Sequence, residues 1–146
     1  MKFWDSSAIV PLVVPEVQSR NCEEILKSDS LMMVWALTPV EVLSAIYRKY
    51  RDGAIDRAAL TRAKSRLKGY ESAWVEVKQV DLVRDRTERL LSVHRLRAAD
   101  SLQLAAALVG FEEMTEGAAF VSFDEALADA ADKEGFLVEG AGPARG

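Results

Sequence analysis

Residues 96–108 read Leu-Arg-Ala-Ala-Asp-Ser-Leu-Gln-Leu-Ala-Ala-Ala-Leu, an apolar stretch that one carboxylate, Asp100, interrupts. This composition predicts a helix over 98–109 with most of its surface buried. An unpaired carboxylate inside such a helix would cost a large free energy, so Asp100 needs a compensating charge or a metal ion. The stretch therefore predicts both a buried helix and a functional site attached to it.

Strand-like and helical patterns alternate on both sides of this helix. Strands are expected at 2–5, 31–36, 74–80, 119–122 and 136–138, and further helices at 7–13, 16–28, 39–52, 56–72, 82–94 and 125–134. Such alternation is typical of an α/β domain with a mainly parallel central sheet of about five strands flanked by helices. The chain has the length of one domain, which we expect to comprise residues 1–138, with 139–146 as a disordered tail.

The charge is distributed unevenly, although the net charge is only -4. Residues 45–100 hold fourteen of the nineteen Lys and Arg residues against eight acids, and the remainder is strongly acidic. This regional bias favours a polyanionic ligand, although for any single residue a solvated helix face is the better explanation. Arg48, Lys49 and Arg97 are the candidate contacts to the phosphates of such a ligand.

Other features limit the classes of protein to which the chain could belong. No apolar run approaches the roughly 18 residues that cross a bilayer, so no membrane contact is expected. The start, Met1-Lys2-Phe3-Trp4-Asp5, lacks a secretory leader, which predicts a cytoplasmic protein. Cys22 is the only cysteine, so neither an internal disulfide nor a thiolate metal cluster can form, and we expect Cys22 to be buried.

Three further acids lie near the ends of predicted strands. Asp5 ends the first strand, Asp124 follows the fourth, and Glu41 lies in the first turn of the helix after the second. Because the carboxyl ends of parallel strands meet at one edge of a sheet, these acids can come together there. Together with Asp100 they would repel one another without a cation. A hard divalent ion such as Mg²⁺ or Mn²⁺ is the simplest counterion.

Three of these acids also have a purely structural interpretation. Thr38-Pro39-Val40-Glu41 has the pattern of a capping box, and for Glu41 alone this interpretation is the stronger one. Asp124 could simply cap the helix that follows it. Asp5 is not needed as a cap, because Ser6 or Ser7 could serve, and its alternative is an exposed acid at a strand end.

Read together, four motifs resemble the PIN-domain family. They are Asp-Ser-Ser-Ala at 5–8, Thr-x-x-Glu-x-x-Ser-Ala at 38–45, Leu-Arg-Ala-Ala-Asp-x-x-Gln-Leu-Ala at 96–105 and Phe-Val-Ser-x-Asp at 120–124. Within that family the chain is most similar to the VapC-type toxins of bacterial type II toxin-antitoxin pairs. The resemblance extends over residues 1–138, and the segment around Asp100 is its most specific part.

The resemblance implies a metal-dependent endoribonuclease that hydrolyses RNA phosphodiester bonds by in-line attack of a water activated by the ion. The catalytic residues that hold Mg²⁺ or Mn²⁺ would be Asp5, Glu41, Asp100 and Asp124. Ser122 matches a supporting position of the family, and Ser6 is a second candidate for that role. The implied partners are an RNA substrate, a cognate antitoxin protein and a second copy in a homodimer.

Other functions remain to be weighed against this one. A PIN scaffold that binds RNA or a protein partner without cutting is the main alternative, since sequence does not reveal geometry. A haloacid-dehalogenase-like phosphatase would need a second Asp where Ser7 stands, and no Gly-Lys-Ser/Thr phosphate loop occurs. A receiver domain is also disfavoured, because Asp81 lies at a helix start. His94 and Cys22 are not required by the proposed chemistry.

Overall fold

The fold is a five-stranded parallel sheet between two groups of helices. The computed structural model describes residues 1–141. Within them the strands are β1 (Lys2–Trp4), β2 (Met32–Trp35), β3 (Val75–Val77), β4 (Ala119–Ser122) and β5 (Leu137–Gly140), in the order β3-β2-β1-β4-β5. Every neighbouring pair is parallel. The predicted α/β domain with a sheet of about five strands is confirmed.

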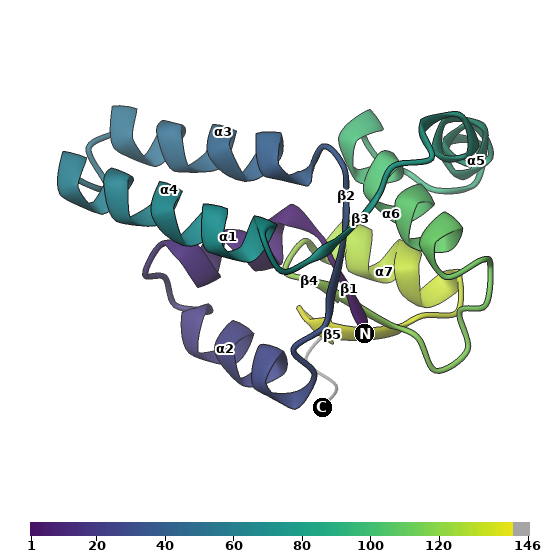
Figure 1. The fold of residues 1–146 in the computed structure, drawn as a ribbon. Helices are drawn as coiled ribbons and strands as arrows, with labels where there is room; N and C mark the ends of the chain where they lie inside the picture. The colour runs from purple at the N-terminus through teal and green to yellow at the C-terminus, as the bar shows by residue number, and fades with distance from the viewer. Residues whose placement is uncertain (142–146) are drawn as a thin grey trace.

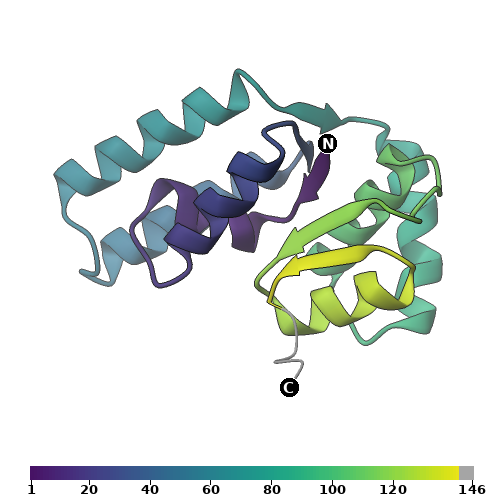
Figure 2. The same ribbon diagram turned by 90° about the horizontal axis from the view of Figure 1, so that it is seen from below.

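Seven helices cover the two faces of the sheet in the described part of the chain. They are α1 (Ser6–Val13), α2 (Ser19–Ser28), α3 (Thr38–Arg51), α4 (Arg57–Glu71), α5 (Val80–Val93), α6 (Ala98–Gly110) and α7 (Glu125–Lys133). Figure 1 shows α1 to α4 on one side of the strands and α5 to α7 on the other. Figure 2 shows β4 and β5 side by side next to α7. Across residues 1–141, no helix has the length and apolar composition needed to span a bilayer.

Alternating side chains of the strands fill two separate cores. Phe3, Met33 and Phe120 pack against α5, α6 and α7, whereas their neighbours Trp4 and Val121 pack against the helices of the other face. Successive residues of a strand point to opposite faces, so a strand buried on both sides must be apolar throughout. This explains why the central strands read as continuous apolar runs. Cys22 is buried in the core around Trp4, as expected.

The two edge strands differ from their predicted lengths. β3 has three residues instead of seven, because the chain leaves the extended conformation at Gln79 and α5 begins at Val80. β5 continues through Glu139 and Gly140, two residues that we expected in the tail, because both pair with β4. Gly140 has a φ of +103°, and a Cβ there would collide with the Ser122 carbonyl oxygen, so glycine is required. The remaining tail residues, 142–146, lie outside the described residues.

Helix α6 comes close to side chains of the sheet at Gly110, its last residue. A Cβ there would lie 2.9 Å from the Val77 Cγ2 atom and would overlap the Met33 sulfur. We expect Gly110→Ala to lower the free energy of unfolding by about 1–3 kcal/mol through overpacking, measured by urea denaturation. Gly69→Ala in α4 is the matched control. Apart from its chain neighbours and the nearby backbone of α4, a Cβ at Gly69 would have no atom of residues 1–141 within 4 Å. Gly69→Ala should therefore raise the free energy of unfolding by roughly 0.5–1 kcal/mol. Equal effects of the two variants would contradict the close approach at Gly110.

Candidate functional site: an acidic cleft at the carboxyl ends of the strands

All four predicted acids line one cleft of about 540 Å³. The strand order β2-β1-β4 places the carboxyl ends of these strands side by side, and the chain continues from them into Asp5, α3 and Asp124. Asp100 reaches the same place from the first turn of α6. Four segments that are distant in sequence therefore contribute one carboxylate each, and three of these acids follow strand ends that parallel topology brings to one edge of the sheet.

Asp5 is the most deeply buried of the four acids, with an exposed fraction of 3%. Contrary to expectation it is the N-cap of α1: its Oδ1 accepts from the Ser7 backbone N–H at 3.0 Å. Its Oδ2 accepts from the hydroxyls of Ser7, at 2.6 Å, and Ser122. Burial raises the pKa of the Asp5 carboxyl, the hydroxyl bonds partly offset this, and nearby Glu41 raises the pKa further. The side chain of Asp5 therefore both caps α1 and lines the cleft.

The capping-box interpretation of Glu41 is wrong. Helix α3 begins at Thr38 with Leu37 in the cap position and without a side-chain cap. The Thr38 hydroxyl instead contacts the buried amide of Gln103, and Glu41 Oε2 accepts from Ser6 Oγ at 2.8 Å and Gln103 Nε2 at 3.0 Å. Glu41 is thus held at the cleft by two donors from other helices. Ser6, predicted as a supporting residue, bridges toward Asp5, whose Oδ1 lies 3.3 Å from its hydroxyl.

Asp100 is half-buried at the edge of the cleft. Its only ion pair within residues 1–141 is with Arg97, whose Nε lies 3.8 Å away and whose side chain is 88% exposed, so the pairing is weak. Burial raises the pKa of the Asp100 carboxyl, and the charges of Asp124 and Asp5 raise it further, with Arg97 acting in the opposite direction. In the folded protein, Asp100 is therefore close enough to Asp5 and Asp124 for their charges to repel its own.

Asp124 is the helix cap that the sequence allowed, and it also stands at the cleft. It is the N-cap of α7, with Oδ1 accepting from the Leu127 N–H at 2.9 Å, and it also lines the cleft. Its own backbone N–H donates to Ser122 Oγ at 3.1 Å. The Ser122 hydroxyl thus joins Asp5 to the segment carrying Asp124, which agrees with its predicted supporting position.

Sequence reasoning missed two residues at this site, Ser7 and Gln103. Ser7 Oγ accepts from the Phe123 N–H at 2.9 Å while donating to Asp5, so it joins the turn after β1 to the turn after β4. Gln103 carries a fully buried amide that binds Glu41. A signal for Gln103 was present in the sequence, because a polar residue three positions after Asp100 shares its helix face.

Removing the Ser7 hydroxyl should destabilise the protein. In Ser7→Ala the buried Asp5 carboxylate loses one donor and the Phe123 N–H loses its acceptor. We expect the free energy of unfolding to fall by about 1–3 kcal/mol, measured by urea denaturation. Ser44→Ala removes an exposed hydroxyl of the same cleft that has no hydrogen bond within residues 1–141, and should change the value by less than about 0.5 kcal/mol. Similar values for the two variants would refute the structural role of Ser7.

The predicted RNA contacts are only partly brought together. Arg48 and Arg97 line the cleft and are exposed. Lys49 does not line it, because one step along α3 turns the side chain by about 100°, and its Nζ instead pairs with Glu16 Oε1 at 2.5 Å. Two guanidinium groups therefore remain as candidate phosphate contacts at this cleft.

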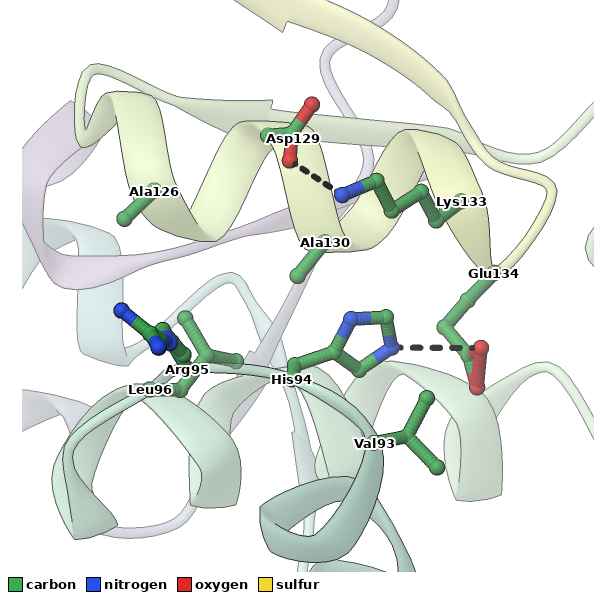
Figure 3. A pocket seen from close by; sticks show the side chains of 9 residues that line it. All are labelled: Val93, His94, Arg95, Leu96, Ala126, Asp129, Ala130, Lys133 and Glu134. Carbon is green, nitrogen blue, oxygen red and sulfur yellow. Dashed lines mark ion pairs between the residues drawn. The ribbon is translucent and has the colours of Figure 1, made fainter.

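His94 lies in a different cavity, of about 500 Å³, between the end of α5 and α7. Its side chain is only 6% exposed, and Nε2 lies 3.4 Å from Glu134 Oε2, the pair drawn in Figure 3. None of the four predicted acids lines this cavity. His94 is the C-cap of α5.

The donor set of the acidic cleft fits a hard divalent cation. Within residues 1–141 no Lys or Arg forms a salt bridge with Asp5, Glu41 or Asp124, so their charges have no protein counterion. No group of three or more His, Cys, Asp or Glu residues in the described chain is arranged so that it could hold a metal ion by itself. Mg²⁺ binds through one or two carboxylates and keeps several waters, so an open arrangement of oxygens suits it.

Comparison with known proteins agrees with this geometry. The family described as "PIN domain" matches residues 2–133, a range that contains every residue of the acidic cleft. PIN domains are generally nucleases, and these nucleases generally use divalent metal ions. No curated protein is similar enough to the chain to count as a match. With nearly the whole fold and all four carboxylates inside the matched range, the chain belongs to the PIN-domain family.

Proposed function

We propose that the protein is a Mg²⁺- or Mn²⁺-dependent endoribonuclease that hydrolyses RNA phosphodiester bonds. One observation carries this proposal: Asp5, Glu41, Asp100 and Asp124, from four separate segments, line a single cleft. Three of them have no cationic partner in residues 1–141, and burial and mutual repulsion raise the pKa of Asp5 and Asp100. Burying these mutually repelling carboxylates lowers the stability of the metal-free protein, and a bound divalent ion would offset that repulsion.

The acids and the arginines of the cleft would have different roles in such a reaction. A bound ion would stabilise charge on the phosphate and lower the pKa of the attacking water. Asp5 and Asp100 are the first choice as direct ligands, with Glu41 and Asp124 binding directly or through water. Arg48 and Arg97 stand at the exposed border of the cleft, where guanidinium groups suit the phosphates on either side of the scissile bond.

The finer proposal is that the protein is the cytoplasmic toxin of a toxin-antitoxin pair and acts as a homodimer. The motif resemblance to VapC-type toxins supports it. Val40 on α3 lines the cleft and is 63% exposed, and Leu37, the residue before α3, is 49% exposed, so the start of this helix offers an apolar surface that suits a protein partner. An antitoxin Arg that enters the cleft could replace the charge of the ion, so Mn²⁺ and the antitoxin should compete for the protein.

The nuclease proposal is tested with the purified protein and a broad panel of RNAs. Cleavage is expected with Mn²⁺, and it should disappear with EDTA or in Asp5→Asn. Equal cleavage under all three conditions would eliminate the metal mechanism. Retention of RNA by a protein that cleaves none of the panel would instead favour a PIN scaffold that binds without cutting.

A further inference from the structure

Gln103 is a fully buried carboxamide in the apolar helix α6, three residues after Asp100. Burying an amide is costly unless it is hydrogen-bonded, so its partners decide whether the fold tolerates it. Its Nε2 donates to Glu41 Oε2 at 3.0 Å and to Thr38 Oγ1 at 3.1 Å. Both acceptors belong to α3, so the amide joins the helix of Asp100 to the helix of Glu41.

Glu41 is held on one oxygen and free on the other. Oε2 accepts two hydrogen bonds, from Gln103 Nε2 and from Ser6 Oγ at 2.8 Å. Oε1 accepts none from residues 1–141, and Glu41 lines the cleft. Two donors on one oxygen fix the rotation of the carboxylate and leave the second oxygen available to a ligand.

The chemistry of the donor matters as much as its position. An Arg or Lys in place of Gln103 would also orient the carboxylate, but it would neutralise the charge that attracts a cation. A neutral amide fixes the geometry and leaves the full negative charge on Glu41. Thr38 contacts the same amide, so the orientation of the donor is itself fixed. Groups of this kind, which contact a metal ligand and not the metal, commonly set metal affinity.

We propose that Gln103 is the positioning residue for Glu41, orienting its carboxylate for the divalent ion and thereby setting the ion affinity of the cleft. The inference rests on the proposed metal-dependent function and deepens it. A role in core packing alone would give a different result, because filling space affects stability and leaves ion affinity unchanged. The two roles are therefore separated by measuring Mn²⁺ binding and unfolding on the same variants.

The experiment titrates the purified protein with Mn²⁺ and follows the electron paramagnetic resonance signal of the free ion. Gln103→Leu removes the hydrogen-bond donor. Gln103→Met also removes it, but its side chain is longer than that of Leu and unbranched like that of Gln, so it provides a second variant if Gln103→Leu does not fold. Both should bind Mn²⁺ about tenfold more weakly or worse, the usual effect of losing such a partner. The double variant Glu41→Gln/Gln103→Leu should bind no more weakly than Glu41→Gln alone, because the amide acts only through Glu41.

Ser101→Ala is the matched control, because Ser101 is a fully buried polar residue of the same helix whose hydroxyl has no hydrogen-bond partner among residues 1–141. It should bind Mn²⁺ as the wild type does. Wild-type affinity in both Gln103 variants, or additive losses in the double variant, would overturn the positioning role and leave the nuclease proposal standing. A wild-type protein that neither binds Mn²⁺ nor cleaves RNA would overturn both proposals.

Discussion

Asp100→Asn is expected to lower the rate of RNA cleavage while raising the melting temperature of the metal-free protein. The loss of activity should be about 100-fold or more, the effect of removing one group from a preorganised electrostatic site. Asn keeps the size and one oxygen of the side chain but removes the charge that a cation requires. The rate is measured on the RNA that the wild type cuts best, with Mn²⁺ at saturating concentration for the variant.

The opposite effect on stability follows from the surroundings of Asp100. Burial, and then the charges of Asp124 and Asp5, raise the pKa of its carboxyl above the ordinary value of an aspartic acid. A carboxyl with a raised pKa in the folded state stabilises the fold while it is protonated, and this contribution is lost as the pH rises through the folded pKa. At neutral pH the charged group is therefore unfavourable in the metal-free protein.

Asp100→Asn should consequently melt higher than the wild type at pH 7 in EDTA, by about 3 °C if the gain is roughly 1 kcal/mol. The difference should shrink as the pH is lowered toward 4. Asp85→Asn changes an exposed acid of α5 outside the cleft and is the control. Its cleavage rate and its melting temperature in EDTA should both stay close to those of the wild type. A metal-free Asp100→Asn protein that melts lower than the wild type would mean that the contact with Arg97 outweighs the repulsion.

The layered fold was predictable because it depends on local patterns. A short continuous apolar run such as 119–121 suits a strand that is covered on both faces, and the structure covers β4 in this way. The edge strands were predicted less well, because their lengths depend on pairing with a neighbour. Glu139 and Gly140 lack the apolar character of a strand, yet pairing with β4 includes them in β5.

The acids of the site were predictable, but the contacts that hold them were not. Asp5 and Asp124 follow strands, and the sheet topology alone brings strand ends together. The capping box at Thr38 was a reasonable local interpretation that failed because Thr38 bonds to Gln103, 65 residues away. Ser7 likewise meets Phe123 at a separation of 116 residues. A local pattern carries no information about such partners, so the hydrogen bonds around the carboxylates appear only in three dimensions.

Mn²⁺ is expected to raise the melting temperature of the wild type strongly at neutral pH. A ligand that binds only the folded state at 100 times its dissociation constant contributes about 2.7 kcal/mol, which corresponds to roughly 8 °C for a chain of this size. The physical reason is that the positive charge of the ion offsets the unfavourable burial and mutual repulsion of the charged carboxylates, the two effects that raise the pKa of Asp5 and Asp100. The shift is measured by thermal unfolding with and without Mn²⁺.

The dependence of this shift on pH and on the acids identifies its origin. An ion binds the charged carboxylates, so the stabilisation should fall as the pH is lowered through the raised pKa values of Asp5 and Asp100. Asp5→Asn should lose most of the shift at every pH, and Asp85→Asn should keep it. An equal shift in both variants would place the ion at another surface. A shift that is lost whenever one of the four acids is replaced by its amide would place the ion at the cleft that these acids line.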